Sequence, residues 1–181
     1  MQLKAEADRF RLFFVRGGVR RRAHPGKVIG MKIFPLGADR SHFRALFKDY
    51  YEELDCDEDI DHLLDEYVLA DFDAELLSIA VAAEDVPCGF VIYQIDGIEN
   101  EWCLREGMGT IRELYVAPRY RGSGAGSLLM RFAEERLAEA GAHKIYVLPA
   151  EGTQGFFIAH GYEEADEYCD ETDCNYFYKT L

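Results

Sequence analysis

The stretch that decides the fold is RYRGSGAGS, residues Arg119–Ser127. It carries two arginines and three glycines at alternate positions, and it lies between a strand-like run, 111–117, and a strongly helical run, 127–140. Glycine allows the backbone to adopt positive φ and to approach a ligand closely. The first amides of a helix point outward without intrahelical partners, at the positive end of the helix dipole. A glycine-rich turn that opens a helix after a strand therefore predicts a phosphate-binding loop.

Two common nucleotide-binding motifs do not fit this stretch. The Rossmann fingerprint, G-x-G-x-x-G, would place its third glycine where the chain has Ser127. The acidic residue that this fingerprint requires about twenty residues later, at the end of a second strand, is also missing. The P-loop needs a lysine after its glycines, and residues 119–127 contain none. The loop therefore predicts a phosphate-containing ligand that is bound by neither of these two motifs.

The spacing Arg-x-x-Gly-x-Gly does occur, from Arg121 to Gly126. Together with the wider stretch ELYVAPRYRGSGAGSLL, residues 113–129, it places strand, proline, arginine, glycines and helix in one order. This order resembles the acetyl-CoA-binding motif of the GNAT N-acetyltransferase superfamily. The resemblance extends over about residues 32–181, by segment order alone outside the central motif.

The order of the remaining segments predicts an α+β fold. Ser41 and Thr153 are expected to cap two of the helices, and the strand–helix–strand run around residues 127–140 requires a right-handed crossover that makes its two strands parallel. The resemblance implies a mixed, mostly antiparallel central sheet of about seven strands, splayed between strands four and five, with about four helices. The expected strands are 32–36, 77–83, 88–95, 110–117, 144–148, 162–168 and 175–180, and the expected helices are 41–54, 60–68, 127–140 and 153–160.

The resemblance also implies acetyl-CoA as co-substrate and suggests which residues hold it. Strand four would expose its backbone to the pantetheine arm, and an N–H there would polarise the thioester carbonyl, an effect worth roughly 3 kcal/mol. The loop amides would hold the pyrophosphate. The strand residues are Leu114, Tyr115 and Val116, and the loop residues are Arg121, Gly122, Ser123, Gly124, Ala125, Gly126 and Ser127.

Glu113 is the candidate general base. It is the acidic residue in an otherwise apolar strand run, so its carboxylate should be partly desolvated, which raises the pKa of the group towards values useful for proton transfer. The superfamily often has a glutamate at this place. The alternative is a structural ion pair, for example with the neighbouring Arg112.

The residue that would donate a proton to the leaving thiolate, the general acid, departs from the family pattern. Where the superfamily often has a tyrosine, this chain has Phe157, and where it often has an asparagine, the chain has Ala150. The leaving thiolate either departs unassisted or takes its proton from another tyrosine. His160 is interpreted as a helix-end histidine beside the dipole. The tyrosines that remain candidates are Tyr115, Tyr120 and Tyr168.

Composition narrows the class of protein. The chain has 181 residues, enough for one domain with a core. Residues 1–30 carry eight basic and two acidic residues, and residues 31–181 carry twelve and thirty-two, which gives net charges of +6 and −20. The acidic body argues against a nucleic-acid partner, since it repels phosphate backbones. No run of eighteen apolar residues occurs, which argues against a membrane-spanning helix.

The basic segment, residues 1–30, is expected to be an extension outside the fold, and residues 31–181 are expected to form a single N-acetyltransferase domain. Two origins of the extension stay open: sequence upstream of the natural start codon, and a mitochondrial transit peptide, against which the scarcity of serine counts. Five scattered cysteines indicate a reducing compartment, so a cytoplasmic location is the simplest expectation. Cys169 and Cys174 are read as flanking a hairpin tip, and no metal site is expected.

The predicted function is transfer of the acetyl group of acetyl-CoA to a primary amine, by direct attack in a ternary complex. The acceptor is a small molecule or a peptidyl amine, and a homodimer stays open. Acidic residues in the segments expected to choose the substrate favour a cationic amine. The alternative is a CoA-binding sensor or assembly module without catalysis. These acidic residues are Asp55, Asp57, Glu58, Asp59, Asp166, Asp170, Glu171 and Asp173.

Overall fold

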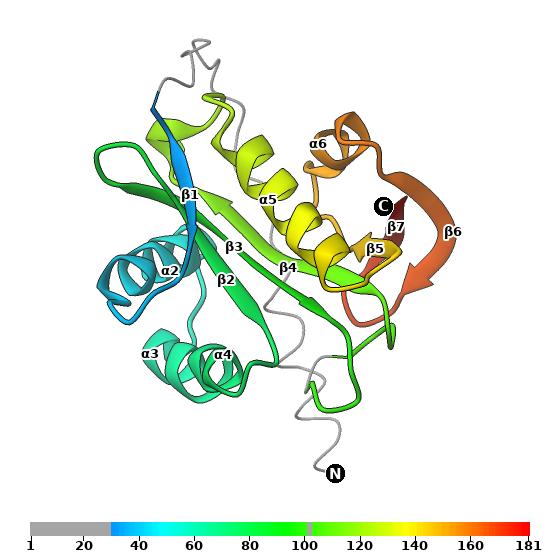
Figure 1. Cartoon of the computed structure of the whole chain (residues 1–181), viewed down its shortest axis with the longest axis horizontal. Coiled ribbons are helices and arrows are strands. Elements are labelled where there is room, and N and C mark those ends of the chain that lie inside the picture. The colour runs from blue at the N-terminus through cyan, green and yellow to red at the C-terminus, as the bar shows by residue number, and fades with distance from the viewer. Residues whose placement is uncertain (1–29, 101–102) are drawn as a thin grey trace.

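The computed structural model describes residues 30–100 and 103–181. The predicted basic extension lies outside the described residues, apart from Gly30. A seven-stranded sheet forms the centre of the molecule, with helices on both of its faces (Figure 1). The strands are β1 Lys32–Pro35, β2 Ser78–Ala83, β3 Pro87–Ile95, β4 Gly109–Val116, β5 Lys144–Val147, β6 Glu163–Cys169 and β7 Cys174–Thr180. The helices are α2 Ser41–Glu53, α3 Ile60–Leu63, α4 Ala70–Asp73, α5 Ala125–Glu139 and α6 Gln154–Ala159, with a π-helical segment at Leu64–Leu69 and a 3₁₀ turn at Pro118–Tyr120.

The sheet has the predicted mixed topology. The strand order is β1-β2-β3-β4-β5-β7-β6, and the one parallel pair among these neighbours is β4 with β5. This confirms the crossover expected through the helix after the glycine loop. The parallel ladder contains only Gly109↔Ile145 and Thr110↔Tyr146, although β4 runs on to Val116. The two strands therefore part after Thr110, and the predicted splay is confirmed.

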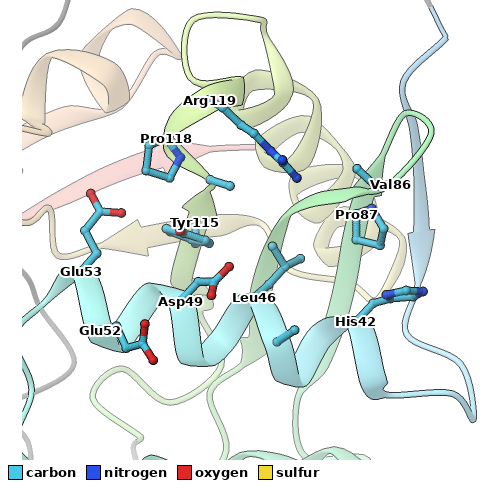
Figure 2. Close-up of a pocket in the computed structure, with 12 residues that line it drawn as sticks. His42, Leu46, Asp49, Glu52, Glu53, Val86, Pro87, Tyr115, Pro118 and Arg119 are labelled. Atoms are coloured by element: carbon cyan, nitrogen blue, oxygen red, sulfur yellow. The ribbon is translucent and has the colours of Figure 1, made fainter.

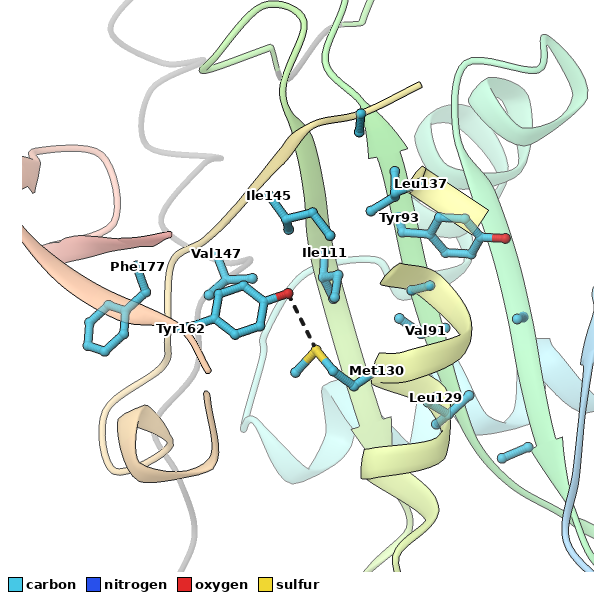
Figure 3. Packing of buried hydrophobic residues seen from close by; sticks show 14 of the residues in the cluster. Val91, Tyr93, Ile111, Leu129, Met130, Leu137, Ile145, Val147, Tyr162 and Phe177 are labelled. Atoms are coloured by element: carbon cyan, nitrogen blue, oxygen red, sulfur yellow. Dashed lines mark hydrogen bonds between the residues drawn. The ribbon is translucent and has the colours of Figure 1, made fainter. Parts of the chain in front are cut away.

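Two apolar clusters fix the helices to opposite faces of the sheet. On one face, Phe43 and Phe47 of α2 are fully buried against Phe90 of β3. On the other face, Leu129 and Met130 of α5 are fully buried in a second cluster that includes strand residues of β3, β4 and β5 (Figure 3). Complete burial of one such side chain contributes about 1.5–3 kcal/mol. The sheet is thus held between α2 and α5.

A β-bulge changes the course of β4. Glu113 lies opposite Ile92, and Ile111 lies opposite Tyr93, so Arg112 is an extra residue between the two pairs. After the bulge, each side chain of β4 points to the face of the sheet opposite to the one that it would take in a regular strand. Ile111 packs in the cluster beneath α5, whereas Tyr115 packs in the cluster beneath α2. The sequence pattern predicted a regular strand here and missed this inversion.

The helix ends differ from the prediction in two places. Arg40, and not Ser41, is the N-cap residue of α2, and Asp39 accepts the Ser41 backbone N–H at 3.0 Å through its Oδ1. Thr153 is the N-cap of α6 as predicted, but its side chain does not cap the helix, because its hydroxyl donates to the Ala150 carbonyl at 2.7 Å. The second helix also continues further than predicted, through the π-helical segment to Asp73.

Two of the five cysteines lie in the last hairpin, as predicted. Cys169 and Cys174 are register partners at the end of the β6–β7 ladder, and both are free thiols. Within residues 30–100 and 103–181 no group of three or more His, Cys, Asp or Glu side chains is arranged to hold a metal ion. In the same residues, none of the helices has the length and apolar character needed to cross a membrane.

Candidate active site

The glycine loop joins the end of β4 to the start of α5. Gly122 and Gly124 adopt φ of +78° and +94°, in the region that favours glycine, and Gly124 is the N-cap of α5. The Leu128 N–H donates to the Gly124 carbonyl at 3.1 Å, as an i to i−4 helical bond does. The amides of Gly126 and Ser127 precede this bond, so they belong to the first turn, whose N–H groups have no intrahelical acceptor. The loop therefore presents unpaired donors at the positive end of a 15-residue helix.

Gly126 is not required by the packing of the protein itself. A Cβ at this position would meet its nearest neighbours, Phe156 and Leu114, at 3.5 and 3.7 Å, which is ordinary van der Waals contact. Its φ is not among the positive values either. Packing against α6 and β4 therefore does not select glycine at this position. A residue without a side chain in the first turn of a helix permits close approach of a ligand to the helix amides.

The Arg121 side chain is bound by protein groups. Its terminal nitrogens donate to both carboxylate oxygens of Glu53 in α2, at 2.7 and 2.6 Å, and its Nε donates to the Val116 carbonyl at 2.9 Å. Bidentate pairs of this kind have a well-defined geometry. Arg121 thus ties the loop to the end of β4 and to the C-terminal turn of α2, while its backbone takes part in the loop.

The backbone of β4 has donors on the side where β5 has departed. The Ala117 N–H donates to Cys88 of β3 at 2.9 Å. Because successive backbone groups of a strand alternate in direction, the N–H groups of Leu114 and Val116 point away from β3. The Tyr115 N–H points towards β3, so Tyr115 contributes its side chain and not its amide to the site. Two of the three predicted strand residues therefore offer amides at the splayed edge.

Glu113 is buried beneath α2. Only 4% of the residue is exposed, and the Tyr50 hydroxyl of α2 donates to its Oε2 at 2.5 Å. Its Oε1 has no hydrogen-bond partner among residues 30–100 and 103–181. Burial raises the pKa of Glu113 to about 8, against the opposing effects of Tyr50, Arg112 and the nearby Tyr51 hydroxyl. A carboxyl group with such a pKa can take up and release a proton near neutral pH.

A groove of about 800 Å³ lies between α2, the start of β3 and the end of β4 (Figure 2); Tyr115 lines it, two residues after Glu113. Carboxylates of α2 gather near Tyr115, at the end of the groove towards the C-terminus of α2, and Arg119 and His42 lie towards the other end. Burial, followed by the charge of Glu53, raises the pKa of Tyr115 to about 12. The groove is lined by His42, Ala45, Leu46, Asp49, Glu52, Glu53, Val86, Pro87, Tyr115, Ala117, Pro118 and Arg119.

The candidate proton donors lie in different parts of the molecule. Tyr115 follows Glu113 by two residues on β4 and is 4% exposed. Tyr120 lies in the 3₁₀ turn, with the Arg119 guanidinium 4.9 Å from its ring centroid. Tyr168 lies on β6, is 54% exposed, and donates to Asp173 within its own hairpin. Phe157, at the usual tyrosine position, packs edge-on against Tyr162. Of the three tyrosines, Tyr115 is nearest to Glu113 along the chain.

One residue of this region, Tyr50, was not singled out as a site residue by sequence reasoning, yet its hydroxyl binds Glu113. His160 is at the end of α6, as predicted, and its Nδ1 lies 2.7 Å from the Phe156 carbonyl. Its Nε2 also lies 2.9 Å from the Ser127 hydroxyl, so it links α6 to the loop. The available signal for Tyr50 was a hydroxyl-bearing side chain within the expected helix 41–54.

Comparison with known proteins agrees with this arrangement. Residues 40–162 match the model of the acetyltransferase (GNAT) family. A GNAT acetyltransferase of Staphylococcus aureus Mu50 is 14% identical, with a TM-score of 0.65 over 83% of this chain and 99% of that one. The PaiA N-acetyltransferase of Thermoplasma acidophilum, in complex with coenzyme A, is 15% identical, with a TM-score of 0.63 over 84% and 100%.

A third similar structure is AAC(6')-Iy in complex with the bisubstrate analogue CoA-S-monomethyl-acetylneamine. It is 21% identical, with a TM-score of 0.63 over 77% of this chain and 95% of that one. At these identities the likeness of the three structures shows a shared fold.

Proposed function

Because the chain belongs to the acetyltransferase (GNAT) family, we propose that residues 31–181 transfer the acetyl group of acetyl-CoA to a primary amine within a ternary complex. The observation that carries the proposal is Glu113. It is a buried carboxyl group with a pKa of about 8, and its buried Oε1 has no hydrogen-bond partner among the described residues. It lies on the strand whose edge amides face the splay. A general base and a row of backbone donors are thus on one strand, next to a phosphate-type loop.

The residues present fit acetyl-CoA. The loop amides of Gly126 and Ser127, at the start of α5, suit a pyrophosphate. The amides of Leu114 and Val116 suit the pantetheine arm, because β5 no longer pairs with β4 there. The lack of a side chain at Gly126 suits close approach of the diphosphate to the backbone. The remaining loop residues, 121–125, would shape this cradle through their positive-φ glycines and through the anchored Arg121.

When bound, acetyl-CoA supplies an acetyl thioester, whose C–S bond breaks as the amine nitrogen forms the new C–N bond. Glu113 accepts the proton that the ammonium group must lose before the nitrogen attacks. The edge amide of Leu114 or Val116 donates to the carbonyl oxygen as negative charge develops on it. The proton gained by Glu113 offsets the one that the released thiolate takes up, either from solvent or from Tyr115.

The acceptor is proposed to be cationic. Asp49 and Glu52 are exposed carboxylates at the groove end nearest Tyr115, and the ion pairs of the described residues do not include them. The third acid there, Glu53, is neutralised by Arg121. Unpaired carboxylates raise the local concentration of a cationic amine. A small-molecule amine and a peptidyl amine both meet this requirement.

The experiment is a thiol-release assay with purified protein, acetyl-CoA and a panel of amines: aliphatic monoamines, polyamines, an aminoglycoside and lysine peptides. We expect thiol release with at least one cationic amine and less with neutral amines of similar size. Tight acetyl-CoA binding without turnover on any amine would refute the enzymatic proposal. That outcome would favour the alternative, a CoA-binding module, for which the replacement of the usual tyrosine by Phe157 is the specific argument.

A further inference from the structure

Two of the free cysteines face each other across the last hairpin. Cys169 and Cys174 are register partners at the end of the antiparallel β6–β7 ladder. Directly opposite residues of such a ladder have side chains on the same face of the sheet and Cα atoms about 4.5–5.5 Å apart. A disulfide needs Cα atoms about 4.4–6.8 Å apart. The register therefore places the two thiols within the range of a disulfide.

The turn between the two cysteines is already closed by backbone hydrogen bonds. The N–H groups of Thr172 and Asp173 both donate to the Cys169 carbonyl, at 3.3 and 3.0 Å. Asp173, the residue before β7, adopts a positive φ of +56°, and its carboxylate accepts the Tyr168 hydroxyl. A bond between the sulfurs would close a short loop whose ends are already held together, so little chain entropy opposes it.

The tip of this hairpin is weakly paired. The ladder is irregular between Glu164 and Tyr168. Beyond this irregularity two register pairs remain, the cysteine pair and Tyr168 with Asn175. β6 is also the last strand at its side of the described sheet (Figure 1). A short end of this kind opens locally at low free-energy cost. Opening gives a reagent access to the sulfurs, and a cross-link would keep the tip closed.

The two thiols differ in exposure. Cys169 is 5% exposed, whereas Cys174 is half-buried, with its Sγ 3.4 Å from the Thr172 hydroxyl. Burial raises the pKa of the Cys174 thiol, so it reacts slowly at neutral pH and faster at alkaline pH. Cys174 is thus the sulfur that a reagent meets first, and Cys169 is the sulfur next to it.

We propose that Cys169 and Cys174 form a thiol-modification site that takes a small-molecule disulfide. The Cys174 thiolate attacks one sulfur of the reagent, breaks its S–S bond and releases one thiolate. The Cys169 thiolate then attacks the Cys174 sulfur of this mixed disulfide and releases the second thiolate. The reagent is reduced to two thiols and the cysteine pair is oxidised, while the two cysteine protons pass through solvent to the released thiolates. A pool of reducing thiols reverses both steps.

The charge of the turn favours a cationic reagent. Asp170, Glu171 and Asp173 are exposed carboxylates between the two cysteines. They raise the local concentration of a cation and repel an anion. Cystamine, a small disulfide with an ammonium group at each end, is therefore the probe.

The test is peptide mapping by mass spectrometry after treatment of the native protein with cystamine at pH 8.5. Trypsin cleaves after Lys144 and Lys179, so one peptide, 145–179, contains both residues and no other cysteine. We expect this peptide to become lighter by two hydrogen atoms and to regain its mass with dithiothreitol. A peptide that stays unmodified, or that carries a cysteamine adduct on each sulfur, would overturn the proposal. A link that forms only in urea would also overturn it, because the fold would then not hold the sulfurs together.

Single substitutions separate the two steps. Cys169→Ser removes the second thiol, so a cysteamine adduct should accumulate on Cys174. Cys174→Ser leaves only the buried thiol, whose adduct should form about tenfold more slowly. Cys56→Ser removes a half-buried cysteine outside the hairpin and is the matched control, in which the link should form as in the wild type. Equal adduct rates in the first two variants would overturn the assigned order of attack.

Hydrogen exchange measures the effect on the hairpin tip. In the oxidised protein the amides of residues 168–175 should exchange about tenfold more slowly, because the cross-link removes conformational freedom from the open tip. The amides of α2, which lies elsewhere on the sheet, should exchange as before and serve as the internal reference. Unchanged exchange at the tip would show that the cross-link does not keep it closed. None of these measurements uses turnover, so their outcome is independent of the proposed acetyl transfer.

Discussion

The glycine loop and the pocket of Glu113 are neighbours in space that are built in different ways. The loop is nine consecutive residues, Arg119–Ser127, whose conformation follows from its own glycines and from the helix that it opens. The pocket of Glu113 brings together the β4 bulge and α2, which supplies Tyr50 and Tyr51. In the proposed mechanism a local element binds the diphosphate, whereas proton transfer uses a carboxyl group buried by a distant segment. Changes in the loop should therefore affect cofactor binding, and changes in the pocket should affect the pH dependence of the rate.

The largest effect is expected for Glu113→Gln. General-base catalysis contributes about 10²–10⁴-fold to a rate, so kcat should fall by at least about a hundredfold. In the wild type only the ionised form is active, and with a pKa of about 8 its fraction, and so the rate, should rise with pH up to and beyond neutrality. The variant should lose this rise. Initial rates between pH 6 and 10 measure both effects.

The KM for acetyl-CoA is the internal control for Glu113→Gln. In the proposed complex backbone amides hold acetyl-CoA and the Glu113 side chain does not, so the KM should change less than threefold. A rate that keeps its wild-type dependence on pH would remove Glu113 from the mechanism, whatever the size of the loss in kcat.

The next effect is expected for Gly124→Ala. Gly124 is the N-cap of α5 at φ +94°, where an L-residue costs about 1–2 kcal/mol. The strain should displace the loop amides, raise the KM for acetyl-CoA about tenfold, and leave the midpoint of the pH profile in place. Initial rates at varied acetyl-CoA concentration give the KM, and initial rates at varied pH give the midpoint.

Gly155→Ala is the matched control for Gly124→Ala. Gly155 lies inside α6, a Cβ there meets nothing within 4 Å, and its φ is not among the positive values. This substitution should leave the KM within twofold of the wild type. Equal effects of the two substitutions on the KM would show that the backbone conformation of the loop does not govern cofactor binding.

A third change, Tyr50→Phe, removes the hydroxyl bond to Glu113 and leaves the carboxyl group of Glu113 in place. The Tyr50 hydroxyl bond lowers the pKa of Glu113, so its loss should move that pKa above its value of about 8. At pH 7 a smaller fraction of Glu113 would then be ionised, and the rate should fall by about three- to tenfold, with recovery at alkaline pH. Tyr178→Phe removes a hydroxyl bond to Glu167 on the last hairpin and should change neither quantity. A downward shift in the midpoint of Tyr50→Phe would contradict this account.

The contrast between the two regions also explains what the sequence could predict. The loop, the helix after it and the parallel β4–β5 pair were predicted because glycine spacing and the strand–helix–strand order are local signals. The splay was predicted from the resemblance to the GNAT superfamily. The burial of Glu113 was predicted from the apolar residues around it and agrees with its 4% exposure. Its partners were not predicted, because Tyr50 lies 63 residues away along the chain and the Arg112 bulge leaves no mark in a hydrophobic pattern.

The residue that caps a helix and the partner of a side chain were likewise not predictable from local sequence. Ser41 was expected to cap α2, but its backbone N–H is bound by Asp39, since either of these neighbouring residues suits a cap and the local geometry decides. Arg121 was expected at the phosphates, and its backbone is in the loop, but its guanidinium binds Glu53, which is 68 residues away. Local pattern identifies the residue types of the site, while long-range packing decides what each side chain contacts.

The smallest effect is expected for Ser127→Ala, which tests whether α6 supports the loop. The Ser127 hydroxyl lies 2.9 Å from His160 Nε2, and the Nδ1 of that ring lies 2.7 Å from the Phe156 carbonyl, so Nδ1 donates and Nε2 can accept from the hydroxyl. Removing the hydroxyl should loosen the first turn of α5 and raise the KM for acetyl-CoA about twofold, with an unchanged pH midpoint. Ser41→Ala, at the start of α2, is the control and should leave the KM as it is. A pH midpoint that moves in Ser127→Ala would show that the loop and the Glu113 pocket are coupled, which the separate construction of the two regions argues against.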